Sequence, residues 1–153
     1  MEQDRLLDLL RRVKDGQVTP EEAVLQLKMQ PFEDLGYAKV DHHRKLRHGI
    51  AEVIYGEGKT PEQIAGIIEA MRQNGEKNIL VTRLSAEKAG ELSKTLEFKY
   101  NPVARIAICG YAPEVTAPGT IAVVAAGTSD LPVAEEAAVT AEALGNRVER
   151  VYD

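Results

Sequence analysis

The sequence predicts an α/β fold, in which a helical hairpin precedes a small α/β domain and a single βαβ unit follows it. Two observations carry this prediction. Strand-like and helix-like segments alternate between residues 32 and 109, as they do in layered α/β domains. Residues 120–152 then hold an apolar strand, a glycine turn, a helix and a second strand within about 30 residues, the length of a βαβ unit.

The first 30 residues predict two short helices that form a hairpin. Apolar residues recur at helical spacing between Leu6 and Val13, and Gly16 then provides a stop. Thr19-Pro20-Glu21-Glu22 has the sequence of a capping box, in which the first and last residues satisfy free amides at a helix start. We expect this hairpin to pack against something.

The middle of the chain predicts a domain of strands and helices, which with the hairpin occupies residues 1–109. Its expected elements are strand 36–41, strand 52–55, a helix from Pro61 to about Asn74, strand 78–82, a helix from Ser85 to about Leu96 and strand 104–109. Thr60 before Pro61 repeats the capping device, and Ser85 is the expected cap of the next helix.

Residues 110–119 have the glycine and proline content of a linker, and the βαβ unit follows at 120–153. Its expected parts are strand 120–126, turn 127–130, helix 132–144 and strand 147–152. A lone βαβ unit leaves strand edges and one sheet face open, so it is not expected to be a complete domain. Either it extends the preceding sheet, or the chain is cut from a longer protein.

Composition excludes several classes of protein. The single cysteine, Cys109, cannot form an internal disulfide, and we expect it to be buried and unreactive. The charged amino terminus does not resemble a secretory signal, and the longest apolar run, 121–126, is too short to span a membrane. The 19 basic and 24 acidic residues give a net charge of −5, which argues against general nucleic-acid binding. These observations predict a cytoplasmic protein.

The turn Gly127-Thr128-Ser129-Asp130 is the candidate binding site. It follows an apolar strand and opens a helix, the position at which α/β proteins bind ligands. A glycine that permits close approach and two hydroxyls at the positive end of a helix suit phosphate, and Asp130 suits ribose hydroxyls. The alternative is that Ser129 or Asp130 merely caps the helix.

A second candidate is the basic segment from Asp41 to Lys59. Arg44, Arg47 and Lys59 are possible contacts for phosphate or carboxylate, and the alternative is a solvated strand end. Gly56-Glu57-Gly58-Lys59-Thr60 lacks the first glycine of a phosphate loop, because Val53 stands there. We predict no metal site, since adjacent histidines 42 and 43 point to opposite faces of a strand. The pair Glu135-Glu136 is explained by an exposed helix face.

Two long segments of the sequence form recognisable motifs. The first consists of Asp41–Arg44, Arg47–Gly49 and Glu52–Gln63, and the second is Val124–Ala137. Both resemble the LarB family, whose members are also labelled AIR-carboxylase-related or circadian phase modifier-like. The second is similar to the first strand, turn and helix of a PurE-like aminoimidazole ribonucleotide carboxylase domain, which also carries a Ser-Asp pair. The resemblance covers the whole chain and departs at Ala51, where proline is expected.

The resemblance implies an activity. Members of the family carboxylate the pyridinium ring of nicotinic acid adenine dinucleotide and hydrolyse its phosphoanhydride, which makes a precursor of a nickel pincer cofactor. It further implies CO2 or bicarbonate as a substrate, assistance by Mg²⁺, an octamer, and a reactive cysteine beyond residue 153 that Cys109 does not match. We therefore expect a truncated chain that has no catalytic residue and is inactive alone.

Three alternatives remain open at this point. The chain could be a non-enzymatic module that binds nucleotides or regulates another protein through the Arg44–Lys59 region. It could have aminoimidazole ribonucleotide carboxylase activity of the purine pathway. RNA binding through the basic strand is the third, and the scarcity of interleaved aromatic residues counts against it.

Overall fold

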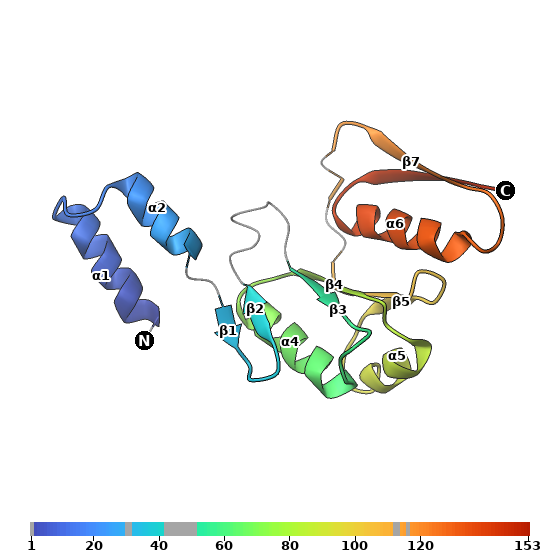
Figure 1. Cartoon of the computed structure of the whole chain (residues 1–153), viewed down its shortest axis with the longest axis horizontal. Helices are drawn as coiled ribbons and strands as arrows, with labels where there is room; N and C mark the ends of the chain where they lie inside the picture. Colours follow the sequence, from blue (N-terminus) through green and yellow to red (C-terminus); the bar gives the residue numbers. More distant parts are fainter. Residues whose placement is uncertain (1, 30–31, 42–51, 112–113, 116) are drawn as a thin grey trace.

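The computed structural model describes residues 2–29, 32–41, 52–111, 114–115 and 117–153. It is a mixed α/β fold, which confirms the predicted class (Figure 1). The helices are α1 (Glu2–Lys14), α2 (Pro20–Met29), α4 (Pro61–Gln73), α5 (Ala86–Leu92) and α6 (Leu131–Ala143). The strands are β1 (Phe32–Asp34), β2 (Lys39–Asp41), β3 (Val53–Tyr55), β4 (Asn78–Thr82), β5 (Lys99–Asn101), β6 (Ile106–Gly110), β7 (Thr120–Ala125) and β8 (Arg147–Tyr152).

Helices α1 and α2 form the predicted hairpin. Gly16 in the connection has a φ of +71°, a backbone conformation that glycine adopts readily. The capping box at the start of α2 is complete, because the Thr19 amide donates to Glu22 Oε2 at 2.9 Å and the Glu22 amide donates to Thr19 Oγ1 at 3.1 Å.

The strand expected at 36–41 is wrong in its first half. Strands β1 and β2 pair antiparallel. The turn between them includes residues 36–38, which the apolar pattern predicts to be extended. Gly36 has a φ of +81°, and the Leu35 amide donates to the Ala38 carbonyl at 2.9 Å. The glycine therefore reverses the chain where the apolar pattern alone indicated an extended segment.

The central sheet has four strands in the order β3-β4-β6-β5. Strands β3 and β4 are parallel, and the other two pairings are antiparallel. The three strands expected in this sheet, β3, β4 and β6, are confirmed to within two residues, whereas strand β5 was not predicted. Helix α5 ends at Leu92, earlier than expected. The Ser93 hydroxyl donates to the Gly90 carbonyl at 2.8 Å, and the Thr95 hydroxyl donates to the Leu92 carbonyl at 3.3 Å. These hydroxyls compete with backbone amides for the carbonyl oxygens at the end of the helix.

Both faces of the central sheet are covered. On one face, Ile79 and Val81 of β4 lie in a core with apolar residues of α4 and α5. On the other face, Leu80 of β4 packs in a cluster with Val139 and Ala143 of α6. The alternation along a strand thus directs neighbouring residues into two different cores.

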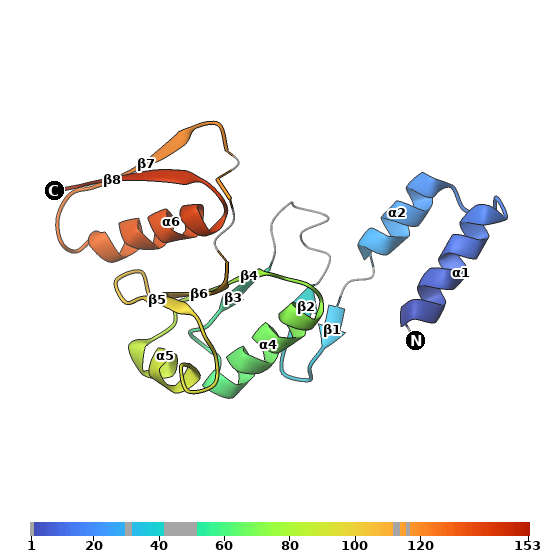
Figure 2. The same ribbon diagram turned by 180° about the vertical axis from the view of Figure 1, so that it is seen from behind.

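The predicted βαβ unit is present, with parallel strands β7 and β8 joined through α6. These two strands form a sheet of their own, so within the described residues the unit does not extend the central sheet. Figures 1 and 2 show α6 between the β7–β8 pair and the central sheet. Val124 and Val151 on the strand face turned away from α6 are exposed. In the described part of the chain, no helix has the length and apolar character needed to cross a bilayer.

Candidate functional site

The turn between β7 and α6 lies at the carboxyl end of β7, where ligands bind in many α/β proteins. Gly127 has a φ of +89°, and the Asp130 amide donates to the Gly127 carbonyl at 3.2 Å, which closes the turn. Residues 127–130 are all exposed. Within the described residues, the side chains of Thr128, Ser129 and Asp130 make no hydrogen bond, so their oxygens are available to a ligand.

Asp130 begins helix α6 without capping it through its side chain. Its backbone carbonyl accepts from the amides of Val133 and Ala134 at 3.1 and 2.9 Å, but its carboxylate accepts no capping hydrogen bond. The proposal that this aspartate merely caps the helix is therefore wrong for the observed conformation. Asp130 is exposed, so its carboxylate is accessible from solvent at the turn.

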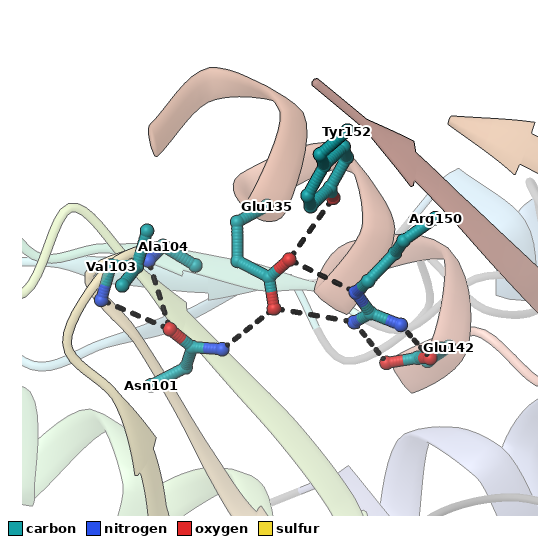
Figure 3. Close-up of polar contacts among 7 residues, drawn as sticks. All are labelled: Asn101, Val103, Ala104, Glu135, Glu142, Arg150 and Tyr152. Carbon is teal, nitrogen blue, oxygen red and sulfur yellow. Dashed lines mark hydrogen bonds and ion pairs between the residues drawn. The ribbon is translucent and has the colours of Figure 1, made fainter. Parts of the chain in front are cut away.

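Helix α6 is held in place by a carboxylate in its second turn. Glu135 accepts from Arg150 Nε at 2.9 Å and from the Tyr152 hydroxyl at 3.0 Å, both on β8. It also accepts from Asn101 Nδ2 at 3.0 Å, at the end of β5 (Figure 3). These hydrogen bonds, with that from Arg150 the strongest influence, lower the pKa of the Glu135 carboxyl. One side chain thus joins the βαβ unit to the central sheet.

The hydrogen-bond network around Glu135 extends further through two of its partners, Arg150 and Asn101. Arg150 also forms an ion pair with Glu142, with Nη1 and Oε1 separated by 2.6 Å, and these carboxylates raise the pKa of the guanidinium. At the other end, Asn101 Oδ1 accepts from the amides of Val103 and Ala104 at 3.0 Å each, which shapes the loop between β5 and β6 (Figure 3). The side chains of Asn101, Glu135 and Arg150 are therefore engaged with one another, and we assign this cluster a structural role.

The neighbouring Glu136 is also paired. It forms a bidentate ion pair with Arg83 at the end of β4, with distances of 3.1 and 3.0 Å. Side-chain exposures of 15% for Glu135 and 23% for Glu136 show that an exposed helix face does not explain these acids. The expectation was wrong because α6 has a sheet on each side, so its acidic face meets the central sheet.

Basic residues gather at the carboxyl ends of the parallel strands β3 and β4, and we call Lys59, Arg83, Lys88 and Arg105 the basic rim. Lys59 Nζ donates to the Tyr55 carbonyl at 3.0 Å. Lys88 Nζ donates to the carbonyls of Gly56 and Glu57 at 3.0 and 2.8 Å. The two ammonium groups therefore hold the loop between β3 and α4 in place.

Two arginines of the basic rim have unusual backbones. Arg83 and Arg105 each have a φ of +54°, a left-handed conformation that costs a non-glycine residue about 1–2 kcal/mol. The Leu84 amide donates to the Arg105 carbonyl at 2.8 Å, and the Tyr100 hydroxyl donates to the Leu84 carbonyl at 2.9 Å. These bonds join the ends of β4 and β6, and thereby maintain both conformations.

A tyrosine and a glutamate accompany the basic rim. The Tyr55 hydroxyl donates to the Glu57 carboxylate, which lowers the pKa of Glu57 and raises that of Tyr55. The nearby charges of Arg105, Arg83 and Lys88 lower the pKa of Glu57 further. The carboxylate therefore stays ionised and offsets part of the positive charge.

Of the other residues singled out in the sequence, some lie outside the described part of the chain and one is described. Arg44, Arg47 and the three histidines lie outside the described residues, so their convergence with Lys59 on an anion stays a prediction. Cys109 is described, and the expected burial is confirmed: it is 1% exposed in β6, and burial raises the pKa of its thiol. In the described ranges no three His, Cys, Asp or Glu side chains are grouped to hold a metal ion.

Sequence reasoning found Lys59 of the basic rim, but it missed Arg83, Lys88 and Arg105 and the Glu135 network. No motif marks Arg83 or Arg105, because their left-handed backbones depend on contacts between strands and not on residue type. The pair Glu135-Glu136 was noticed, but its partners lie at Asn101 and Arg83, 34 and 53 residues away in the sequence. The turn 127–130 was found because glycine, hydroxyls and aspartate form a local pattern.

Two comparisons with known proteins show what this chain is similar to. The profile of the family described as LarB/PurE-like N-terminal domain matches residues 32–111. The chain is also 34% identical over 158 residues to Uncharacterized protein MJ0165 of Methanocaldococcus jannaschii. That match covers 97% of this chain and 60% of the relative, so the chain spans about 60% of the relative's length.

Proposed function

The chain belongs to the LarB family, which is carboxylase-related, and from this premise we propose that it binds the substrate of a pyridinium carboxylase. The proposed reaction of the whole protein is carboxylation of nicotinic acid adenine dinucleotide with hydrolysis of its phosphoanhydride, in the synthesis of a nickel pincer cofactor. The cytoplasm is the proposed location.

The observation that carries the proposal is the exposed turn Gly127–Asp130 at the carboxyl end of β7. Its glycine adopts a positive φ, and its three polar side chains make no hydrogen bond within the described residues. Amides and hydroxyls at the start of α6 suit a phosphate group, and the Asp130 carboxylate suits a ribose hydroxyl. The Glu135 network supports this role, because it fixes the helix that presents the turn.

The catalytic step is not assigned to the described residues. Burial raises the pKa of the Cys109 thiol, which disfavours the thiolate that would add to a pyridinium ring. The described residues do not provide a binding site for Mg²⁺. Asp130 is the one carboxylate of the turn, and within the described ranges no three His, Cys, Asp or Glu side chains are grouped to hold a metal ion. We therefore expect this chain alone to bind the dinucleotide without carboxylating it.

The test is calorimetric titration of the 153-residue chain with nicotinic acid adenine dinucleotide. Ser129→Ala with Asp130→Ala removes the two proposed hydrogen bonds to the ligand, and each such bond to a charged group contributes about 1.5–3 kcal/mol. The affinity of the double variant is expected to fall about a hundredfold or more. Ser93→Ala, a change at the exposed end of α5, is the matched control and should leave the affinity unchanged.

Unchanged affinity in the double variant would exclude this turn as the binding site. Loss of binding after Arg44→Ala and Arg47→Ala, with the turn variants unaffected, would favour a non-enzymatic module that uses the basic segment. Preferential binding of aminoimidazole ribonucleotide at the same turn would favour the purine-pathway carboxylation.

A further inference from the structure

Three members of the basic rim, Arg83, Lys88 and Arg105, lie at one edge of the central sheet. Strands β3 and β4 are parallel, so their carboxyl ends share this edge, and the antiparallel strand β6 begins there. Arg83 directly follows β4, and Arg105 directly precedes β6. Lys88 of α5 is tied to the same edge, because its Nζ donates to the carbonyls of Gly56 and Glu57 in the loop after β3. Cationic side chains from three parts of the sequence are therefore brought together.

The two arginines are placed unfavourably for the stability of the fold. The register that pairs Val81 with Ala107 places Arg83 opposite Arg105 two residues further on, and like charges in opposite positions repel. Both arginines also have a left-handed backbone, with a φ of +54°. Within the described residues, Arg83 is paired with Glu136, whereas the guanidinium of Arg105 makes no hydrogen bond or ion pair. Backbone strain of this kind clusters at sites that bind ligands.

A carboxylate of the protein already lies in the field of these cations. The Tyr55 hydroxyl donates a hydrogen bond to Glu57, and this bond together with the charges of Arg105, Arg83 and Lys88 lowers the pKa of the Glu57 carboxyl. Glu57 and Tyr55 are both exposed, so the carboxylate can turn into solvent without leaving a buried polar group behind. An external anion of higher charge can therefore take its place.

The balance of charges at this edge suits a dianion. Arg83, Lys88 and Arg105 supply three positive charges, and Glu57 and Glu136 supply two negative charges. One positive charge is thus in excess while Glu57 is in place, and two are in excess when its carboxylate moves into solvent, in a chain whose net charge is −5. A carboxylate ligand would only repeat the charge of Glu57. A phosphate monoester carries about −1.5 to −2 near pH 7, and its oxygens accept hydrogen bonds from arginine and lysine.

We propose that this edge of the central sheet is a binding site for a phosphate monoester, with Arg105 as a direct contact and Glu57 as the carboxylate that the ligand displaces. The loop that carries Glu57 is already held in place, since the Gly56 amide donates to the Thr82 carbonyl at 2.8 Å. A site that is ordered in advance loses less conformational entropy when it binds. The proposal does not rest on the dinucleotide-binding function, because no residue of the turn 127–130 takes part.

The first test is titration of the whole 153-residue chain with inorganic phosphate, followed by proton–nitrogen correlation NMR spectra. Sodium chloride at equal ionic strength is the reference. We expect saturable shifts of the amide signals of residues 56–58, 83–84 and 104–106 that chloride does not produce. Phosphate bound at the turn 127–130 would shift other signals, so the two sites are observed separately. Failure of the edge signals to shift, or equal shifts with chloride, would overturn the proposal.

Two variants should change the phosphate affinity in opposite directions. Arg105→Gln removes the guanidinium and should weaken binding about tenfold, as expected for the loss of a hydrogen bond to a charged ligand. Glu57→Gln removes the competing charge, keeps an acceptor for Tyr55 and should strengthen binding about threefold. Arg147→Gln, at the exposed start of β8, makes the same change in net charge as Arg105→Gln and should leave the affinity unchanged. Wild-type affinity in Arg105→Gln, or no gain in Glu57→Gln, would contradict the proposed site.

A third variant separates binding from folding. Glycine adopts a positive φ readily, so Arg105→Gly should melt at or above the temperature of the wild type. Its phosphate affinity should nevertheless fall as in Arg105→Gln, because the guanidinium is absent from both. Wild-type phosphate affinity in Arg105→Gly would show that the Arg105 side chain is not the contact.

RNA is the other source of phosphate groups that a basic edge could bind. Each phosphodiester of RNA carries one negative charge, so an oligoribonucleotide without a terminal phosphate should not shift the edge signals. If it bound there more tightly than inorganic phosphate, with an affinity that fell steeply with salt and was lost in Arg105→Gln, the edge would be an RNA-binding surface and the proposal would be wrong.

Discussion

Single residues in this protein are constrained by contacts that their neighbours in the sequence do not reveal. Gly110 ends β6 with a φ of +102°, and a Cβ atom there would overlap the backbone carbonyl oxygen of Lys77. The Tyr111 amide donates to the same oxygen at 3.1 Å. The linker thus leaves the central sheet through a close approach of two backbone segments that only glycine permits.

Gly110→Ala should therefore destabilise the protein by about 2–4 kcal/mol, because it combines an unfavourable φ with a clash against backbone that cannot rotate away. The free energy of unfolding in urea measures this effect. Gly90→Ala in α5 is the control: nothing lies within 4 Å of its Cβ position, and alanine in a helix should add about 0.5–1 kcal/mol. Equal stability of the two variants would contradict the constraint at Gly110.

At the scale of elements, local sequence signals account for where most helices begin. Thr60 is the cap of α4, with its Oγ1 accepting from the Gln63 amide at 3.3 Å and its amide donating to Gln63 Oε1 at 3.0 Å. Ser85 caps α5 through the Lys88 amide at 3.3 Å. The expected caps are confirmed because capping depends on residues three positions apart.

Thr60→Ala should lower the free energy of unfolding by about 1 kcal/mol, since one amide at the start of α4 loses its side-chain acceptor. Thr60→Ser retains a hydroxyl and should recover most of the loss. Urea unfolding of the two variants beside the wild type measures the difference. If serine and alanine destabilised the protein equally, the effect would come from the threonine methyl and not from the cap.

At the scale of the whole molecule, α6 is the element that unites the two sheets. Val139 and Ala143 of α6 lie in the core on one face of the central sheet. Glu135 of the same helix accepts a hydrogen bond from Arg150 on β8. Asn78 Nδ2 also donates to the Ala143 carbonyl at 2.6 Å, which fixes the end of α6 against β4. The candidate binding turn is therefore positioned by both sheets.

Glu135→Gln should lower stability by about 1–3 kcal/mol at pH 7, because the charged acceptor of Arg150 is lost. The pKa of Glu135 is lowered in the folded protein, so its contribution is present above the pKa of the unfolded state. That contribution is lost as the pH falls through the lower folded-state pKa. Urea unfolding should therefore show the difference between wild type and variant shrinking toward acidic pH.

Glu149→Gln is the control for this measurement, because Glu149 is exposed on β8 in alternation with Arg150. It should change stability little at either pH. A difference between wild type and Glu135→Gln that stayed constant as the pH fell would show that the carboxylate charge is not the source of the stabilisation.

The α/β class, most element boundaries and the turn 127–130 follow from local patterns in the sequence. Apolar periodicity, capping boxes and glycine turns can be recognised there because they depend on residues only a few positions apart. The same patterns indicate a hairpin that packs against another surface.

Other features become visible only in the folded chain: α6 lies between two sheets, Glu135 and Glu136 are paired, and Arg83 and Arg105 adopt left-handed backbones. These features depend on residues tens of positions apart, which are brought together when two apolar faces pack. No local pattern specifies which faces meet, because the packing energy is shared among all the elements that form the cores.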